Sequence, residues 1–173
     1  MASELNNYWG IKVTGVKEWI SFFNAMSSEI GVLTSTTGPE IAQKVISMMN
    51  KRLDSGKDIE GNTFADYSTA YQKKKKSSIV NMKFTGSMRN SLKYSVKFDR
   101  SRGVGIITIY VDGKKNSVKA YVHQTGGPSG RRGKRFMQKE RKWFGITENE
   151  KEQIMLIPVN KLKSFLDRYI SAW

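Results

Sequence analysis

The chain has 173 residues, enough for one domain with extended segments, and no cysteine, which excludes disulfides and thiolate metal sites. The lack of cysteine fits assembly in a reducing cytoplasm. No apolar run approaches the roughly 20 residues that span a bilayer, and the first residues lack the pattern of a signal peptide, so we expect no membrane partner.

The formal net charge of +15 is unevenly distributed along the sequence. Residues 1–50 carry three basic and four acidic side chains, whereas residues 114–142 carry ten basic side chains and one acidic, Glu140. Such asymmetry predicts an acidic partner or a nucleic acid near the second half. A basic surface that only favours solubility is the alternative.

The first predicted elements are a short strand at Trp9–Val13 and a helix that follows it. Apolar residues then recur at helical spacing between Val16 and Ile30. A polar gap at Thr34–Gly38 separates this helix from the next predicted element. We therefore expect two helices, with a break between them, in the first third of the chain.

The second predicted helix begins at Thr37 and runs to Leu53. Thr37 and Glu40 have capping-box spacing, and Pro39 is tolerated in a first turn, where its missing N–H needs no partner. An apolar stripe at helical spacing follows, and Gly56 is a suitable stop signal.

The middle of the chain changes from a polar to a β-type pattern. Residues 57–83 indicate a polar loop with a short helix near Thr69–Lys76, and Thr85–Leu92 has a helical start signal. Tyr94, Val96 and Phe98 then alternate as one face of a strand. The loop 99–103 and the β-branched run Val104–Val111 complete a predicted hairpin.

The last third contains a glycine-rich basic stretch and a terminal helix. The type of the apolar piece Ala120–His123 stays open, and residues 125–135 predict a mobile loop. Thr147 and Glu150 repeat the capping-box spacing, and apolar residues at helical spacing run from Leu162 to the end. That helix docks on the chain's own core or on a neighbouring subunit.

These elements together predict a single α+β domain over residues 1–173. We expect a small antiparallel sheet, centred on residues 93–111, covered by the two N-terminal helices and the C-terminal helix. The glycine-rich basic loop projects from this core.

Catalytic and cofactor chemistry find no support in the sequence, so we expect no enzyme, no cofactor and no metal. His123 is the one histidine, and no nucleophile-elbow motif accompanies it. Asp54, Asp58, Glu60 and Asp66 lie near one another but lack the alternation of a calcium loop. Magnesium-dependent cleavage lost on substitution of Asp58 or Asp66 would revive a nuclease or hydrolase.

Nucleic-acid binding is harder to exclude. Basic residues alternate with Phe136, Trp143 and Phe144 between positions 131 and 144, a mixture that can hold phosphates and stack on bases. The structural alternative is that Trp143 and Phe144 anchor the loop in the core while the charges stay hydrated. A nucleic-acid-binding basic module therefore remains the alternative function.

Four blocks of sequence resemble the phage virion morphogenesis family, also described as tail-completion proteins. The first is Arg52 followed by Gly61–Ser68, with Phe64 where tryptophan is common. The others are Phe84–Leu92, similar to an L-T-G-x-L-R-x-S-L block, Ala120–Gly127, similar to Y-A-x-x-H-Q-x-G-G, and Arg135–Met137, similar to R-P-F-L without its proline. The blocks occur in the family's order.

The resemblance implies a structural virion protein at the neck or the head-proximal end of the tail, assembled in the host cytoplasm. It implies a homo-oligomeric ring of six or twelve copies that joins the portal or an adaptor to the tail tube or tail terminator. Genomic DNA would pass through without specific binding. The family-like core is expected at about residues 38–145, flanked by the strand and helix at 9–30 and the C-terminal helix at 158–173.

Beside this resemblance, polar residues of the blocks are candidates for contacts between subunits or with partners. Arg89 can pair with a carboxylate across a subunit boundary, or it can hold the chain's own loops together. The glycine-rich arm is expected to order on assembly. The candidate contact residues are Arg89, His123, Gln124, Arg131, Arg132, Arg135 and Phe136.

Overall fold

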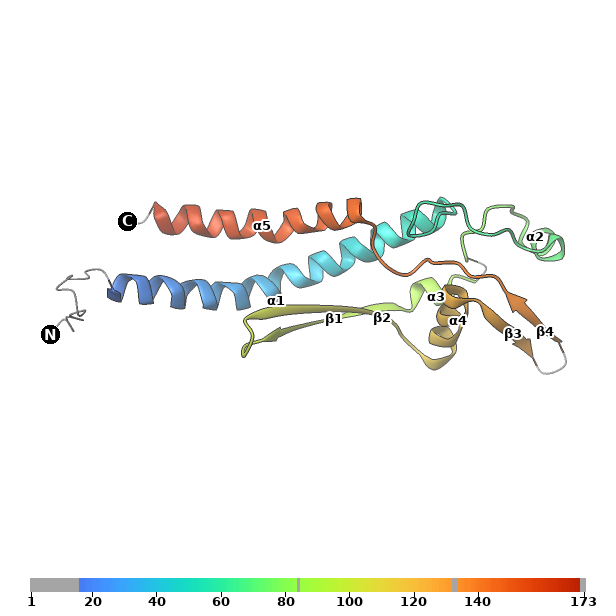
Figure 1. Cartoon of the computed structure of the whole chain (residues 1–173), viewed down its shortest axis with the longest axis horizontal. Helices are drawn as coiled ribbons and strands as arrows, with labels where there is room; N and C mark the ends of the chain where they lie inside the picture. Colours follow the sequence, from blue (N-terminus) through green and yellow to red (C-terminus); the bar gives the residue numbers. More distant parts are fainter. Residues whose placement is uncertain (1–15, 84, 132–133, 172–173) are drawn as a thin grey trace, which may run out of the picture.

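The computed structural model describes residues 16–83, 85–131 and 134–171. The molecule is elongated, and its two long helices run along the long axis (Figure 1). The predicted α+β class is confirmed. The elements, in chain order, are α1 (Val16–Asp54), α2 (Thr69–Lys75), α3 (Ser87–Asn90), β1 (Leu92–Asp99), β2 (Val104–Val111), α4 (Lys114–Thr125), β3 (Gly127–Arg131), β4 (Lys134–Gln138) and α5 (Glu148–Ile170).

Helix α1 is continuous for 39 residues, so the predicted break at Thr34–Gly38 and the helix start at Thr37 are wrong. Pro39 lies inside the helix. Thr34 donates its hydroxyl to the Ile30 carbonyl at 2.9 Å, and Thr37 and Gly38 are buried. Packing therefore overrides the local break signals. The helix ends at Asp54, and Gly56 follows with φ of 68°, which confirms the stop signal.

The hairpin β1–β2 lies against one side of α1, and its predicted strands are confirmed. Tyr94, Val96 and Phe98 share the inner face, as the period-two pattern requires. Gly38 lies against Val96, since a Cβ on Gly38 would be 2.5 Å from the Val96 Cγ1. The missing side chain of this glycine lets the helix backbone and the hairpin approach closely.

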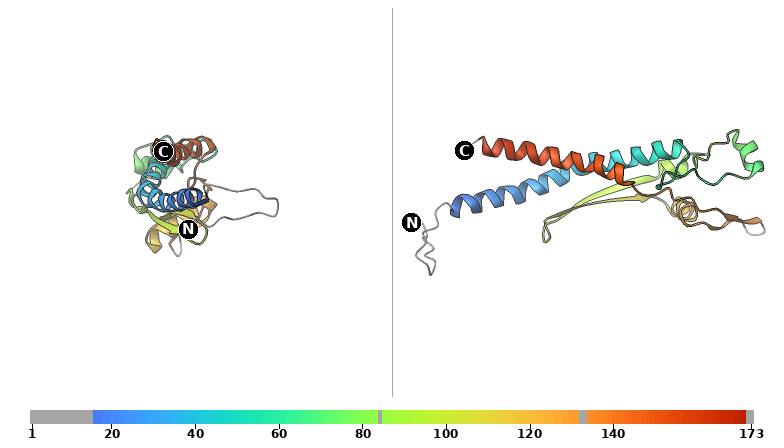
Figure 2. Two further views of the ribbon diagram at one scale, coloured as in Figure 1. Left: turned by 90° about the vertical axis from the view of Figure 1, so that its left-hand side faces the viewer. Right: turned by 45° about the horizontal axis from the view of Figure 1, so that its top comes forward.

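Helix α5 runs antiparallel to α1 and lies on the side of α1 away from the hairpin (Figures 1 and 2). The expectation that it covers the sheet is therefore wrong, because α1 separates the two. Its capping box is confirmed: Thr147 N–H donates to Glu150 at 2.8 Å and Glu150 N–H donates to the Thr147 hydroxyl at 3.1 Å. The helix thus begins well before the expected residue 158.

The other end of the molecule contains the short elements and most of the core. Its fully buried side chains include Met49, Leu53 and Trp143. Trp143 donates its indole N–H to the Ala120 carbonyl at 3.3 Å. The prediction that this tryptophan anchors the chain in the core is therefore confirmed. The short helix near Thr69–Lys76 is also confirmed, and the undecided piece at Ala120–His123 is part of α4.

The expected mobile loop at 125–135 forms instead a second hairpin, β3–β4, in which Gly127 is the partner of Gln138 and Arg131 of Lys134. Backbone pairing overrides the glycine-rich composition here. The strand expected at Trp9–Val13 lies outside the described residues.

The molecule can be divided into two regions. The arm comprises residues 16–54, 92–111 and 148–171, which form α1, the β1–β2 hairpin and α5. The head comprises residues 55–91 and 112–147, which form the remaining elements. The head carries 17 basic and 5 acidic side chains, and the arm carries 12 basic and 9 acidic ones.

Candidate partner-binding site

A cavity of about 680 Å³ opens in the head, lined by α2, α3, α4 and the β3–β4 hairpin; we name it the head pocket. Two of the predicted contact residues, His123 and Phe136, line it. Its lining combines apolar and aromatic side chains (Tyr67, Tyr71, Met82, Met88, Phe136 and Met137) with the cations Lys119, Lys139 and Arg141. Asp66 is its acidic lining residue.

Arg141 is the buried cation of the head pocket, with 3% of its surface exposed. Its Nη2 donates to the Ala65 carbonyl at 2.9 Å, and its guanidinium lies 5.1 Å from the centre of the Tyr67 ring. Its Nε and Nη1 have no hydrogen-bond partner among the described residues. Burial lowers the pKa of this guanidinium.

His123 lies next to Arg141 in the wall of the pocket. Its backbone carbonyl accepts the Arg141 N–H at 2.7 Å. Burial, followed by the charges of Arg141 and Lys119, lowers the pKa of its imidazole from 6.5 to about 4. The ring is therefore neutral near pH 7, and within the described chain its Nδ1 is buried without a partner.

Arg89 and Gln124 hold the chain's own elements together. Arg89 donates to the Asp54 carboxylate at 2.5 and 3.1 Å and to the Asn50 side chain at 2.9 Å, which ties α3 to the end of α1. The hydrogen bond from Arg89 lowers the pKa of Asp54. Gln124 accepts the N–H groups of Trp143 and Phe144 at 3.0 and 2.9 Å.

The remaining candidate residues belong to the β3–β4 hairpin or its loop. Arg131 ends β3 and Arg135 lies in β4, and the backbone of Arg135 is the register partner of Gly130. Arg132 lies outside the described residues. Phe136 is exposed on β4, with Met137 beside it. The structure thus gathers part of the predicted contact set at one place, the rim of the head pocket.

Sequence reasoning missed the role of Arg52 and the burial of Arg141. Arg52 forms an ion pair with Glu150 and donates to the carbonyls of Trp143 and Gly145 at 3.1 and 2.8 Å. This ties the end of α1 to the start of α5. Composition could not distinguish these two arginines from the exposed basic residues. Their partners are distant in sequence: Glu150 is 98 residues from Arg52, and Ala65 is 76 residues from Arg141.

Acidic side chains do not gather into a metal site in the described part of the chain. The Asp58 carboxylate accepts the backbone N–H groups of Glu60 and Asn62 at 2.9 and 2.8 Å, which shapes its own loop. Among the described helices, none is long and apolar enough to cross a membrane.

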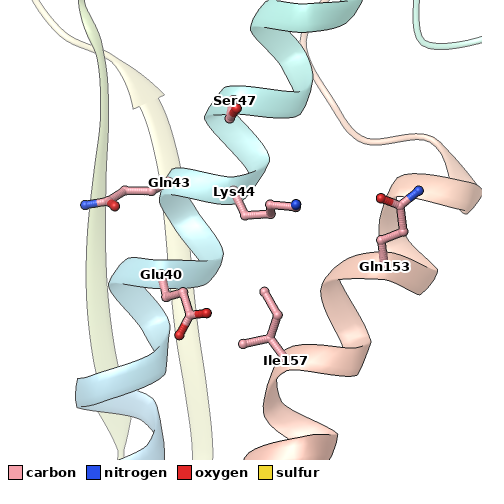
Figure 3. Close-up of a pocket in the computed structure, with 6 residues that line it drawn as sticks. All are labelled: Glu40, Gln43, Lys44, Ser47, Gln153 and Ile157. Atoms are coloured by element: carbon pink, nitrogen blue, oxygen red, sulfur yellow. The ribbon is translucent and has the colours of Figure 1, made fainter.

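A second hollow, of about 580 Å³, separates α1 from α5 (Figure 3). Its lining is mostly polar, and Lys44 extends from α1 towards α5. The lining residues are Glu40, Gln43, Lys44, Ser47, Gln153 and Ile157. This lining offers no arrangement of nucleophile, acid and base.

The comparison with known families decides the identity of the chain. The profile of the phage virion morphogenesis family matches residues 12–163 of the 173. The chain belongs to this family. The match is longer than the core expected at about 38–145 and includes α1 and most of α5. The protein therefore has a structural or assembly role in a phage virion. A search of curated proteins found no match, and neither did a search of solved structures.

Proposed function

We propose that this protein is a neck or tail-completion component that forms a closed ring at the head–tail junction and joins the portal or an adaptor to the tail. It works through contacts between surfaces and catalyses no reaction. Family membership supports the virion role. The observation that carries the ring is a pair of exposed apolar faces on opposite sides of the arm.

The first of these faces is the outer side of the β1–β2 hairpin, which we name the hairpin face. It consists of the exposed β2 residues Val104, Ile106, Thr108 and Tyr110. Lys93 and Lys97 lie beside them on β1, opposite Tyr110 and Ile106. A two-stranded hairpin is only marginally stable by itself and has open edges. Burial of the hairpin face against another protein surface would therefore stabilise it.

The second face lies on α5, and we name it the helix face. It consists of Glu152, Met155, Leu156 and Val159, which are all exposed, while Ile154 on the same helix is buried. Soluble helices normally present polar residues on their solvent side. A cluster of large exposed apolar side chains indicates a surface for protein contact.

The two faces favour a head-to-tail contact between copies. They lie on opposite outer layers of the arm, with α1 between them (Figure 2), so a single chain cannot bring them together. Both are apolar, and Glu152 on the helix face can pair with a lysine on the hairpin face. Hairpin faces paired with each other would bring lysines together. A contact between unlike faces is heterologous, and it closes into a ring when the rotation between copies permits.

The head would contact the other virion proteins. Its net charge of +12, against +3 for the arm, would steer it towards an acidic portal, adaptor or tail-tube surface. A ring of six copies would match the tail and one of twelve the portal. Genomic DNA would slide through the channel without specific binding.

Native mass measurement of the purified protein, alone and with tail or portal components, tests this proposal. A closed oligomer that joins those components is expected. A strict monomer under all these conditions, or purified particles that lack the protein, would overturn it.

A nucleic-acid-binding module is the second candidate, favoured by the charge of the head. It predicts duplex binding whose affinity falls steeply with salt as several phosphates are released. Under the ring proposal, duplex affinity is weak and independent of sequence.

A further inference from the structure

Three arginine side chains with little exposed surface lie at or near the junction of arm and head, and only two have a carboxylate partner among the described residues. Arg52 is paired with Glu150, and Arg89 with Asp54. Arg141 is as buried as either, yet its hydrogen bond goes to a carbonyl and two of its donor nitrogens have no partner in the described chain.

From this contrast we propose that the head pocket binds a carboxylate side chain of another virion protein, which pairs with Arg141. The inference rests on the proposed function, because it assigns one of its partner contacts. A buried guanidinium whose donors are unpaired is destabilising, and a paired and hydrogen-bonded carboxylate offsets that cost. The missing partner is therefore an anion that accepts from Nη1 and from the second N–H of Nη2 across the end of the guanidinium, as a carboxylate does.

The walls of the head pocket specify what flanks this carboxylate. Met82 and Met88 are buried in its lining, and Phe136 and Met137 are exposed on β4. Methionine and aromatic side chains form adaptable apolar contact surfaces. The preferred ligand is therefore an aspartate or glutamate with apolar or aromatic neighbours in sequence.

Access to Arg141 requires a small movement of the pocket wall. The unpaired nitrogens are covered in this structure, while helix α2, which supplies Tyr71 to the lining, has no buried residue. A short helix without buried side chains is displaced at low cost. We expect α2 to shift when the ligand enters.

The source of the carboxylate is another protein and not a second copy of this chain. The head has a net charge of +12, so two heads repel each other. An acidic partner is attracted to the same surface and is guided to the pocket by Lys119 and Lys139, which line it.

The test is an NMR titration of the ¹⁵N-labelled full chain with two probe peptides, acetyl-Leu-Glu-Phe-amide and acetyl-Leu-Gln-Phe-amide. The glutamate peptide should bind about tenfold more tightly, because the ion pair adds to the apolar contacts. It should also shift the Arg141 Nε–H signal and the amides of α2. Arg141→Gln should remove the preference. Lys139→Gln, which removes the same charge from an exposed lining residue, should retain most of it.

Any of the following results would overturn the proposal. Equal binding of the two peptides, no binding at millimolar peptide, or a preference that survives Arg141→Gln would show that Arg141 holds no carboxylate. Arg141→Gln protein that forms smaller oligomers than the wild type would assign the carboxylate to a second copy. A negative titration with an intact ring would leave the proposed function standing, so the two failures are distinguishable.

Discussion

The arm and the head of this protein present different kinds of surface. The arm is nearly balanced in charge and presents apolar faces on both outer layers. The head carries most of the net charge and a pocket in which Arg141 has no carboxylate partner among the described residues. Apolar faces suit a permanent contact with an identical copy, and charge suits recognition of a different protein. Under the proposed function, one small chain thereby combines self-assembly with partner binding.

The largest expected effect comes from charging the helix face. Val159→Asp places a carboxylate in the proposed apolar contact and should convert the oligomer to monomers, measured by analytical ultracentrifugation. The unfolding free energy should change by less than about 0.5 kcal/mol, since Val159 is exposed.

Ser164→Asp is the matched control, because it adds the same charge to another exposed position on α5. At about 100° per residue, Ser164 lies roughly 140° round the helix from Val159, away from Met155 and Leu156. If both variants lost assembly equally, charge alone would be responsible and the helix face would not be the contact.

Replacing Arg52 and Arg141 by methionine compares an arginine that has a carboxylate partner with one that has none among the described residues. Arg52→Met should destabilise the chain by about 3–5 kcal/mol, because Glu150 loses its partner in a poorly exposed site. Arg141→Met should cost less than about 1 kcal/mol or stabilise, since it removes a buried charge without leaving a carboxylate unpaired. Chemical denaturation measures both.

The contrast between these two variants would be lost if Arg141 had an intramolecular partner of equal strength. An Arg141→Met cost as large as that of Arg52→Met would show this.

The pH dependence of the unfolding free energy should show the titration of the His123 imidazole. Its folded pKa of about 4 lies below the unfolded value of 6.5, so the unfolded state binds more protons between these values and stability falls as the pH decreases. The expected loss from pH 7 to pH 5 is about 2 kcal/mol.

His123→Gln should remove most of that slope while carboxylates are still ionised. Denaturation midpoints at both pH values measure the difference. An unchanged slope in the variant would place the titrating group elsewhere.

The smallest expected effect concerns the contact between helix and hairpin in the arm. Gly38→Ala places a Cβ against Val96 and should destabilise by about 1–2 kcal/mol. Gly31→Ala is the control, since its Cβ would be 3.4 Å from the Phe98 ring and Ala favours a helix. In a double-mutant cycle measured by thermal unfolding, Val96→Ala should reduce the destabilisation that Gly38→Ala causes.

The sequence predicted the elements whose signals are local. The alternation of Tyr94, Val96 and Phe98 predicted the hairpin, and the Thr147 and Glu150 spacing predicted the cap of α5. The break in α1 was mispredicted because Gly38 lies against Val96 and Thr34 lies against Gly105, and both hairpin residues are far away in sequence. Local propensity cannot register such a contact.

The candidate site was predicted less completely than the fold. His123 and Phe136 were selected and do line the head pocket. Arg89 and Gln124 were selected with them, yet their polar groups are used within the chain. Arg141 was not selected, because burial distinguishes it from the other basic residues and burial depends on Tyr67 and Ala65, far away in sequence.

Thiol cross-linking most directly tests whether unlike faces meet between copies. The chain has no cysteine, so Thr108→Cys and Val159→Cys introduce the reactive groups on the hairpin face and the helix face, and a short bifunctional thiol reagent joins those that meet. The double variant should give a ladder of covalent oligomers that ends at the size of the closed ring. A mixture of the two single variants should give dimers, and neither alone should cross-link. Cross-linking within either single variant, or none in the double variant, would contradict head-to-tail assembly through these faces.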